Sequence, residues 1–303
     1  MKIVVFGAGA IGSLFGALLA KSNEVVLIGR KKHVESINKN NLKIKGKTNL
    51  NIEIPSQTDI SKVKIKPDLI ILTVKSYDTI EAMKQLSPSI NTNTILMSMQ
   101  NGLDNIDSIQ KKIDVKHVIA GVTTHGAVFS KPGIIFHTGK GQTTIGELDG
   151  KKTKRIINIK KKLINAGIIT EISGNIIRDI WIKTIINSSI NPLTVFCRQK
   201  NGYLLENPIL EKCVDQVCIE STKIAKAYGF GLSSKSMIEK TKEVIKNTAD
   251  NYSSMLQSVN SGRKTEIEAI NGKLVEIGNS YNVDVPLNKA LLYFVKQTNK
   301  KLQ

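Results

Sequence analysis

The sequence predicts an α/β domain followed by an all-helical domain, and three observations support this. Near the N-terminus, a short apolar strand runs into a glycine-rich turn and a helix. Two further apolar runs have the length and composition of buried parallel strands. Beyond residue 173 the hydrophobic pattern is helical throughout. Because the chain has 303 residues, it is long enough for two domains, which we expect at residues 1–173 and 174–303.

The glycine-rich turn has the context of a dinucleotide site. A β-branched strand, Lys2–Phe6, leads into the turn, helix formers continue to Ala20, and a second strand follows at Glu24–Ile28. Glycines at its first, third and sixth positions permit the tight turn, the approach of a pyrophosphate and the packing of helix on sheet. We therefore predict a Rossmann-type dinucleotide-binding domain whose phosphate contacts are Gly7, Ala8, Gly9, Ala10, Ile11 and Gly12.

The residues after the second strand select the cofactor. An NAD site usually carries an acidic residue there, whereas this chain has Gly29, Arg30, Lys31 and Lys32. A carboxylate would repel a 2′-phosphate, and a guanidinium can bind it through two hydrogen bonds. The sequence therefore predicts NADPH, with Arg30 as the main phosphate ligand and Lys31 or Lys32 assisting.

Two more buried strands end at polar residues. Asp68–Val74 is followed by Lys75, and Thr94–Met99 is followed by Gln100 and Asn101. In doubly wound sheets the ligand lies beyond the carboxyl ends of the strands. We therefore expect Lys75 to contact the cofactor or a substrate carboxylate, and Asn101 to contact the nicotinamide ribose.

Short strand segments between Ile119 and Ile145 predict an antiparallel extension of the sheet. Two histidines in this region, His125 and His137, alternate with apolar residues, so we expect structural roles for them. A helix near 152–165 and a strand at 168–172 complete the first domain.

The second half predicts helices only, after a natural boundary at residues 173–175. A cleft between the two domains is the expected ligand site, since ligands bind preferentially at domain junctions. The expected helices span residues 176–196, 208–228, 236–247, 265–281 and 286–300.

One of these helices carries a polar stripe. Lys183, Asn187 and Asn191 recur at intervals of four, so they lie on one helix face, while Trp181 and several isoleucines cover the other sides. A lysine and two primary amides are costly to bury without partners. The stripe therefore indicates the wall of a site for a polar molecule.

Composition excludes several other classes of protein. The net charge of +19 comes mainly from dispersed lysines, since only five of the 44 basic residues are arginines, and aromatic residues make up 5%. Nucleic-acid binding is therefore not expected. Three cysteines without a Cys-x-x-Cys pair and four scattered histidines indicate neither a disulfide framework nor a metal site.

The uncharged run from Ile3 to Ala20 resembles a membrane segment in composition alone. Glycines at positions 7, 9, 12 and 16 interrupt it, so a strand, turn and helix explain it better. We expect a cytoplasmic protein without a membrane partner. A homodimer is possible, but the sequence does not determine the oligomeric state.

Motifs along the whole chain resemble those of the ketopantoate reductase family, also called the 2-dehydropantoate 2-reductase family. The resemblance rests on the glycine turn, Arg30, Lys75, the Gln100-Asn101-Gly102 segment and the Trp181-to-Thr194 helix. It extends to Ser253-Ser254-Met255-Leu256-Gln257, to Gly262-Arg263 with Thr265-Glu266-Ile267, and to Asn271-Gly272.

The resemblance implies NADPH-dependent reduction of ketopantoate to (R)-pantoate, on the route to pantothenate and coenzyme A. Lys183 matches the family's proton donor, and Ala127 and Glu266 match cofactor contacts. Asn101 would be shared between substrate and cofactor. The other substrate contacts implied are Asn187, Asn191, Asn201 and Ser254.

The chemistry of ketone reduction agrees with these roles. Hydride addition to a ketone leaves negative charge on oxygen, and a positioned ammonium group can neutralise it. Three alternatives remain, and the first is a related NADP-dependent 2-keto acid reductase. Another is a 3-hydroxyacid or 6-phosphogluconate dehydrogenase, which has a similar lysine-asparagine helix but a more glycine-rich segment before the lysine. The last is a non-catalytic NADPH sensor, which would not need the lysine.

Overall fold

The computed structural model describes residues 1–300, which form two compact units. Unit 1 contains Met1–Gln100 and Asn105–Asp179, and unit 2 contains Asn101–Asp104 and the described residues from Ile180 onward. A four-residue loop in the first half of the chain therefore belongs to the second unit.

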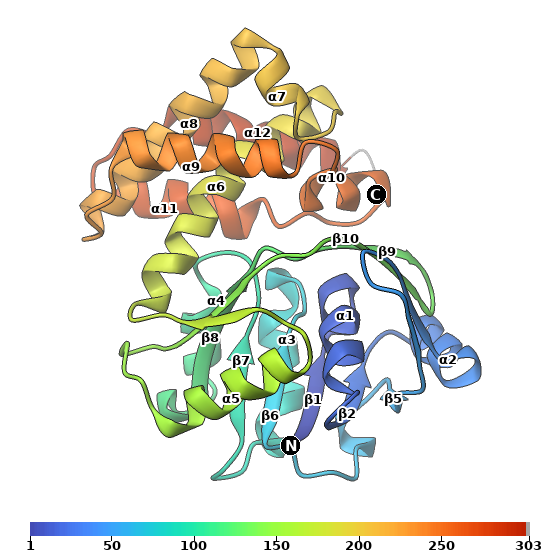
Figure 1. Ribbon diagram of the computed structural model, residues 1–303. Helices are drawn as coiled ribbons and strands as arrows, with labels where there is room; N and C mark the ends of the chain where they lie inside the picture. The colour runs from blue at the N-terminus through green and yellow to red at the C-terminus, as the bar shows by residue number, and fades with distance from the viewer. Residues whose placement is uncertain (301–303) are drawn as a thin grey trace. The chain divides into compact units, whose positions relative to one another are not determined.

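Unit 1 is built on an eight-stranded sheet with the order β12-β11-β8-β7-β6-β1-β2-β5. Neighbouring strands are parallel except β11, which runs antiparallel to β8, so the parallel block from β8 to β5 ends in a reversed pair, β11 and β12. Figure 1 labels the strands of the parallel block. The strands are β1 (Lys2–Phe6), β2 (Glu24–Ile28), β5 (Ser56–Gln57), β6 (Leu69–Leu72), β7 (Ile95–Ser98), β8 (Val118–Thr123), β11 (Thr143–Glu147) and β12 (Thr170–Ile172).

Helices cover both faces of this sheet because its strands are apolar on both sides. Ile3 and Val5 pack with α1 (Ala10–Leu19) and α5 (Lys154–Asn165). Val4 and Phe6, which point the opposite way, pack with α3 (Thr79–Leu86) and α4 (Asn105–Gln110). The predicted doubly wound domain is thus confirmed.

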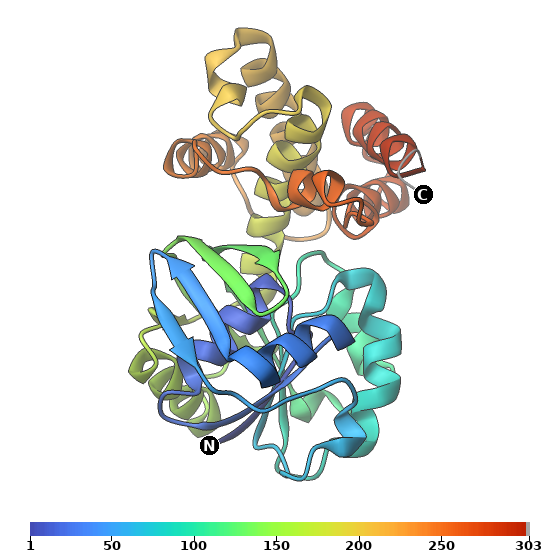
Figure 2. The same ribbon diagram turned by 90° about the vertical axis from the view of Figure 1, so that its right-hand side faces the viewer.

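A second, four-stranded sheet of order β4-β3-β10-β9 packs over α1. Its strands are β3 (Leu42–Gly46), β4 (Leu50–Ile52), β9 (Gly126–Lys131) and β10 (Ile134–Gly139). Figure 2 shows the blue strands β3 and β4 beside the green hairpin β9–β10. The predicted antiparallel extension is therefore correct for β11 but wrong for β9 and β10, because β10 pairs with β3 instead.

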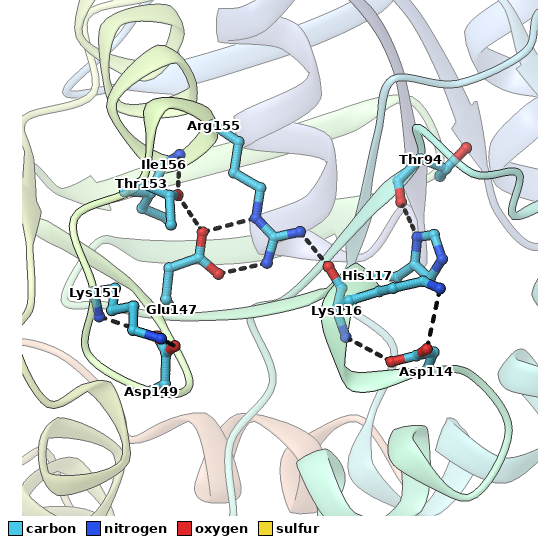
Figure 3. Close-up of polar contacts among 10 residues, drawn as sticks. All are labelled: Thr94, Asp114, Lys116, His117, Glu147, Asp149, Lys151, Thr153, Arg155 and Ile156. Carbon is cyan, nitrogen blue, oxygen red and sulfur yellow. Dashed lines mark hydrogen bonds and ion pairs between the residues drawn. The ribbon is translucent and has the colours of Figure 1, made fainter.

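An ion pair between buried Glu147 and half-buried Arg155 fixes α5 to the sheet (Figure 3). The carboxylate of Glu147, at the end of β11, accepts hydrogen bonds from Arg155 Nε at 2.7 Å and from the Thr153 hydroxyl. Arg155 Nη1 also donates to the carbonyl of Lys116. The remaining short elements of unit 1 are α2 (Lys31–Asn40), η1 (Ile60–Lys62), η2 (Ser76–Asp78), η3 (Ser87–Ser89) and η4 (Val115–His117).

In unit 2, every regular element within the described residues is a helix, which confirms the all-helical prediction. The region predicted as one helix over 265–281 is a π-helix, η5 (Glu268–Gly272), followed by α11 (Lys273–Ser280). The other helices are α6 (Ile176–Cys197), α7 (Tyr203–Glu206), α8 (Pro208–Ala227), α9 (Ser234–Asn247), α10 (Ser254–Asn260) and α12 (Pro286–Lys300). Sequence reasoning missed α7 and α10, which are both short.

Among residues 1–300, no helix is long and apolar enough to cross a membrane. The same part of the chain contains no group of three or more His, Cys, Asp or Glu side chains suited to a metal ion. Cys197, Cys213 and Cys218 are all free thiols.

A buried histidine links three elements of unit 1. The backbone N–H of Gly133 donates to Nδ1 of His33 at 2.9 Å, so the ring proton lies on Nε2, which donates to Ser13 Oγ at 3.0 Å. His33 thereby joins α1, α2 and the β9–β10 turn. Burial lowers the pKa of His33 from 6.5 to about 4.

This pKa predicts that His33 destabilises the native state as the pH falls. Below pH 6.5 the unfolded chain binds a proton that the native state refuses until about pH 4. The wild type should therefore lose about 2 kcal/mol more stability than His33→Gln between pH 7 and pH 5. Urea denaturation of both proteins at the two pH values measures this difference, and parallel pH profiles would contradict it.

Candidate active site

The glycine turn joins β1, β2 and α1. Gly7 has φ of +105°, which a glycine adopts without strain. The N–H groups of Gly7 and Ala8 both donate to the carbonyl of Ile28, at 3.0 and 2.7 Å. Helix α1 then begins at Ala10 without a side-chain cap on Gly9. Its first N–H groups are left for another acceptor, as an anion site requires.

Two glycines of the turn differ in the space around them. A Cβ on Gly12 would lie 2.4 Å from both the Gly7 carbonyl oxygen and Thr73 Oγ1. A Cβ on Gly9 would have no neighbour closer than 3.9 Å, and Gly9 is exposed. Gly12 therefore serves internal packing, whereas the surface at Gly9 is open to a ligand. Ala10 and Ile11, the first two residues of α1, lie between these glycines in the sequence and are half-buried.

Arg30 lies beside this turn. It is the N-cap residue of α2, directly after Gly29, where a Cβ would approach the side chain of Ala8 to 2.9 Å. Its guanidinium is exposed and has no partner within residues 1–300, unlike that of Arg155. Lys31 and Lys32 are also exposed, and Lys31 Nζ is 4.0 Å from Glu35.

The segment after β6 is tied to the same turn. Thr73 Oγ1 donates to the Gly7 carbonyl at 2.7 Å, and half-buried Lys75 follows two residues later as the N-cap of η2. The Gln100 amide donates to the carbonyl of Val74 at 3.1 Å. Lys75 thus lies on a backbone segment held from both sides.

The loop Asn101–Asp104 is fixed at both ends by Thr79. Thr79 Oγ1 accepts from Gln100 Nε2 at 2.7 Å and donates to Asn105 Oδ1 at 2.9 Å. The loop itself contacts residues of unit 2, because Asn101 Nδ2 donates to Glu266 Oε2 at 3.4 Å.

The main chain of this loop meets the start of η5. Gly102 has φ of +98°, and a Cβ there would come within 2.8 Å of the Ala269 carbonyl. The structure therefore brings together two predicted cofactor residues, Asn101 and Glu266, that are 165 positions apart. Glu266 is buried.

The predicted polar stripe lies on α6. Lys183 and Asn187 are half-buried and Asn191 is buried, while Trp181 and Ile185 are buried with them. Nδ2 of Asn191 is a buried donor without an acceptor among residues 1–300. An unpaired buried amide costs free energy, so this donor is suited to a ligand.

Asn201, on the segment after α6, has an unpaired acceptor where Asn191 has an unpaired donor. Its Nδ2 donates to Thr248 Oγ1 at 2.9 Å, and its backbone N–H donates to Asn251 at 3.0 Å. The buried Oδ1 of Asn201 has no hydrogen-bond donor in the described part of the chain. A ligand hydroxyl group could supply that donor.

The two serines at the start of α10 have separate roles. Ser253 is the N-cap, because its Oγ accepts from the Leu256 N–H at 3.1 Å and contacts Thr194 Oγ1 at 2.6 Å. Ser254, the predicted substrate contact, is exposed and is the first residue of the helix. Its hydroxyl is not used for capping.

Ala127 and the two histidines lie in or beside the second sheet. Ala127 on β9 pairs with His137 on β10, and Nδ1 of His125 is 3.2 Å from Nε2 of His137. Burial lowers the pKa of both rings, that of His125 to about 4. Both rings are therefore neutral at pH 7.

Sequence reasoning noted Asn271 only as part of a family motif, missed Glu220 and Asn288, and assigned none of the three a role in supporting α6. Asn271, Asn288 and Glu220 form a hydrogen-bonded chain next to Ser188. The signal that could have found a supporting donor is Pro192, which leaves a helix carbonyl without its usual partner.

A parallel sheet with this glycine turn, followed by a helical unit with a lysine-asparagine helix, defines the class of dinucleotide-dependent oxidoreductases with a helical second domain. Comparison with known proteins narrows the class. The family described as "Ketopantoate reductase PanE/ApbA" matches residues 3–150, and its C-terminal counterpart matches residues 175–299. The chain belongs to the ketopantoate reductase family.

Individual relatives cover the whole chain. A 2-dehydropantoate 2-reductase of Pyrococcus horikoshii is 42% identical over 299 residues, which are 98% of this chain and 97% of the relative. The crystal structure of a PanE/ApbA family ketopantoate reductase from Ralstonia eutropha JMP134 superposes with a TM-score of 0.91 at 28% identity, covering 100% of both chains.

A ternary structure of D-mandelate dehydrogenase with NADH and anilino(oxo)acetate is also similar. Its TM-score is 0.94 at 27% identity, covering 100% of this chain and 99% of that one. This fold therefore accommodates more than one oxidoreductase substrate.

The two glycines of the turn predict opposite outcomes of the same substitution. Gly12→Ala should destabilise the protein by about 3 kcal/mol, because its Cβ would overlap the Gly7 carbonyl. Gly9→Ala should change stability by less than about 0.5 kcal/mol yet weaken NADPH binding, because the methyl group occupies the open surface. Thermal unfolding and fluorescence titration separate the two effects. Unchanged NADPH affinity in Gly9→Ala would remove this turn from the cofactor site.

Proposed function

We propose that the chain is an NADPH-dependent 2-dehydropantoate 2-reductase that reduces ketopantoate to (R)-pantoate, a step toward pantothenate and coenzyme A. The observation that carries the proposal is the 42% identity to a 2-dehydropantoate 2-reductase over 98% of the chain. The polar stripe on α6 supports it, since it supplies a proton donor and two amides on one helix face.

The cofactor is held mainly through its phosphates. The pyrophosphate binds at Gly7–Gly12, where Gly9 is open and the first N–H groups of α1 are free of side-chain caps. The 2′-phosphate binds Arg30, whose guanidinium has no carboxylate partner in residues 1–300. Further contacts come from Lys75, Asn101, Ala127 and Glu266.

The protein's own groups complete the reduction. NADPH supplies the hydride that reduces the ketone carbon. Lys183 Nζ donates a proton to the ketone oxygen, which becomes the hydroxyl group of the product. An ammonium group beside that oxygen also stabilises the negative charge that develops there.

Amide and hydroxyl groups of unit 2 orient the substrate. Asn191 Nδ2 is a buried donor and Asn201 Oδ1 a buried acceptor, neither paired within residues 1–300. A substrate with a carboxylate, a ketone and a hydroxyl group can satisfy both. Asn187 and Ser254 add further polar contacts, and Asn101 is shared with the cofactor.

A panel of substrates tests this function against its alternatives. NADPH oxidation with ketopantoate is compared with NADP⁺ or NAD⁺ reduction by D-mandelate, a 3-hydroxyacid and 6-phosphogluconate. The proposal requires the highest kcat/KM with ketopantoate and NADPH. A higher value with another pair would assign that activity instead, and no turnover with any pair would leave an NADPH sensor. We further propose a cytoplasmic location.

Replacing Lys183 separates chemistry from cofactor binding. Lys183→Ala should lower kcat by about 100-fold or more, because a positioned acid is lost, while NADPH affinity is retained. Steady-state kinetics and NADPH fluorescence titration measure the two quantities. Lys226→Ala, an exposed lysine on α8, is the matched control. An unchanged kcat in Lys183→Ala would exclude Lys183 as the proton donor.

Replacing Arg30 tests the choice between NADPH and NADH. Arg30→Ala should weaken the binding of NADPH by about 2 kcal/mol, a roughly 30-fold rise in its dissociation constant, because charged hydrogen bonds to the 2′-phosphate are lost. Binding of NADH, which lacks this phosphate, should not change. The dissociation constants of both cofactors are measured, with exposed Arg178→Ala as the control. Equal losses for the two cofactors would refute the phosphate contact.

A further inference from the structure

Helix α6 contains a proline in its interior. Pro192 is the seventeenth residue of Ile176–Cys197 and directly follows Asn191 of the polar stripe. Proline has no N–H, so it cannot donate to the carbonyl four residues earlier, and its ring pushes that carbonyl outward. The carbonyl concerned belongs to Ser188.

A side chain from η5 replaces the missing donor. Nδ2 of Asn271 donates to the Ser188 carbonyl at 3.2 Å, and both residues are fully buried. Asn271 lies in the π-helix Glu268–Gly272, where the backbone departs from the regular α-helix. Two irregular segments, the proline break and the π-helix, are thus joined by one hydrogen bond.

A chain of buried groups fixes the orientation of the Asn271 amide. Its Nδ2 also donates to Asn288 Oδ1 at 3.0 Å. Asn288 Nδ2 donates in turn to Glu220 Oε2 at 2.9 Å and to Ser221 Oγ at 3.4 Å. Because Nδ2 of Asn271 serves two acceptors, a flipped amide would lose both bonds.

Glu220 anchors this chain to a third helix. Its carboxylate accepts from the backbone N–H groups of Leu287 and Asn288, at 2.9 and 3.0 Å, at the start of α12. Ser221 Oγ contacts Ser188 Oγ at 3.0 Å. The network therefore ties α8, α12 and η5 to α6 at the proline.

We propose that Asn271 is a positioning residue for ketopantoate reduction, which sets the placement of Asn191 relative to Lys183 by holding the Ser188 carbonyl. The inference rests on the proposed function. Lys183 and Asn187 precede the break and Asn191 lies within it, so a change at Ser188 alters their relative geometry. Asn271 also follows Glu266 by five residues, and thus couples the Glu266 segment to α6.

A double-mutant cycle between positions 192 and 271 tests the proposal. In Asn271→Ala, kcat/KM for ketopantoate should fall about tenfold or more, because misplaced groups lose near-attack geometry, and the KM for ketopantoate should rise. The KM for NADPH should change less than the KM for ketopantoate, since the proposed phosphate contacts of NADPH lie in unit 1. In the Pro192→Ala background the same substitution should cost less, because an alanine at position 192 supplies the N–H that the Ser188 carbonyl lacks.

A control variant and a replacement variant complete the test. Asn279→Ala, an exposed asparagine on α11, should leave the kinetics unchanged. Equal losses from Asn271→Ala in both backgrounds, or a lowered Tm with unchanged kcat and KM, would overturn the positioning role. If Asn271→Ala does not fold, Asn271→Ser replaces it in the cycle.

Thermal unfolding without ligands keeps the inference separate from the proposed function. If the wild type does not reduce ketopantoate, the proposed function fails. The same double-mutant cycle, measured by Tm, still tests the hydrogen bond between Asn271 and the Ser188 carbonyl. Non-additive changes in Tm support coupling between positions 192 and 271. Additive changes would overturn it.

Discussion

The contact between Gly12 and the Gly7 carbonyl is the constraint on which unit 1 depends. A Cβ at position 12 would stand 2.4 Å from that oxygen and from Thr73 Oγ1, so only glycine lets α1 start this close to the strands. The same turn donates two backbone hydrogen bonds to Ile28 at the end of β2 and accepts one from Thr73, just after β6. Three central strands and one helix therefore converge on six residues. The uncapped N–H groups at the start of α1 are a by-product of this packing.

Unit 2 differs from unit 1 because it contains unpaired polar groups on the largely buried helix α6 and on the segment after it. Asn191 and Asn201 each have one buried amide atom that is unpaired among the described residues, and Asn271 has one as well, its Oδ1. The Nδ2 groups of Asn271 and Asn288 nevertheless donate to neighbouring groups and so join the elements that surround α6. Unpaired amides lower stability, and the hydrogen-bonded network around Glu220 offsets part of that cost by tying α8, α12 and η5 to α6.

Local patterns made the core of the fold predictable, together with the elements that carry the proposed site residues. The glycine spacing identified the turn, and the interval of four placed Lys183, Asn187 and Asn191 on one helix. Non-local pairing was not predictable: β3 is a short strand with two lysines, and its partner β10 lies some ninety residues away. The assignment of Asn101–Asp104 to unit 2 depends on contacts with Ala269 that no local pattern encodes.

The chain has a single tryptophan, and its place gives the protein a built-in optical reporter. Trp181 is 2% exposed and stands two residues from Lys183. Its indole lies against the rings of Tyr228 and Phe230, with centroids 4.9 and 5.8 Å away. Emission from that indole consequently monitors the opening segment of α6 and its aromatic surroundings alone, without any introduced label.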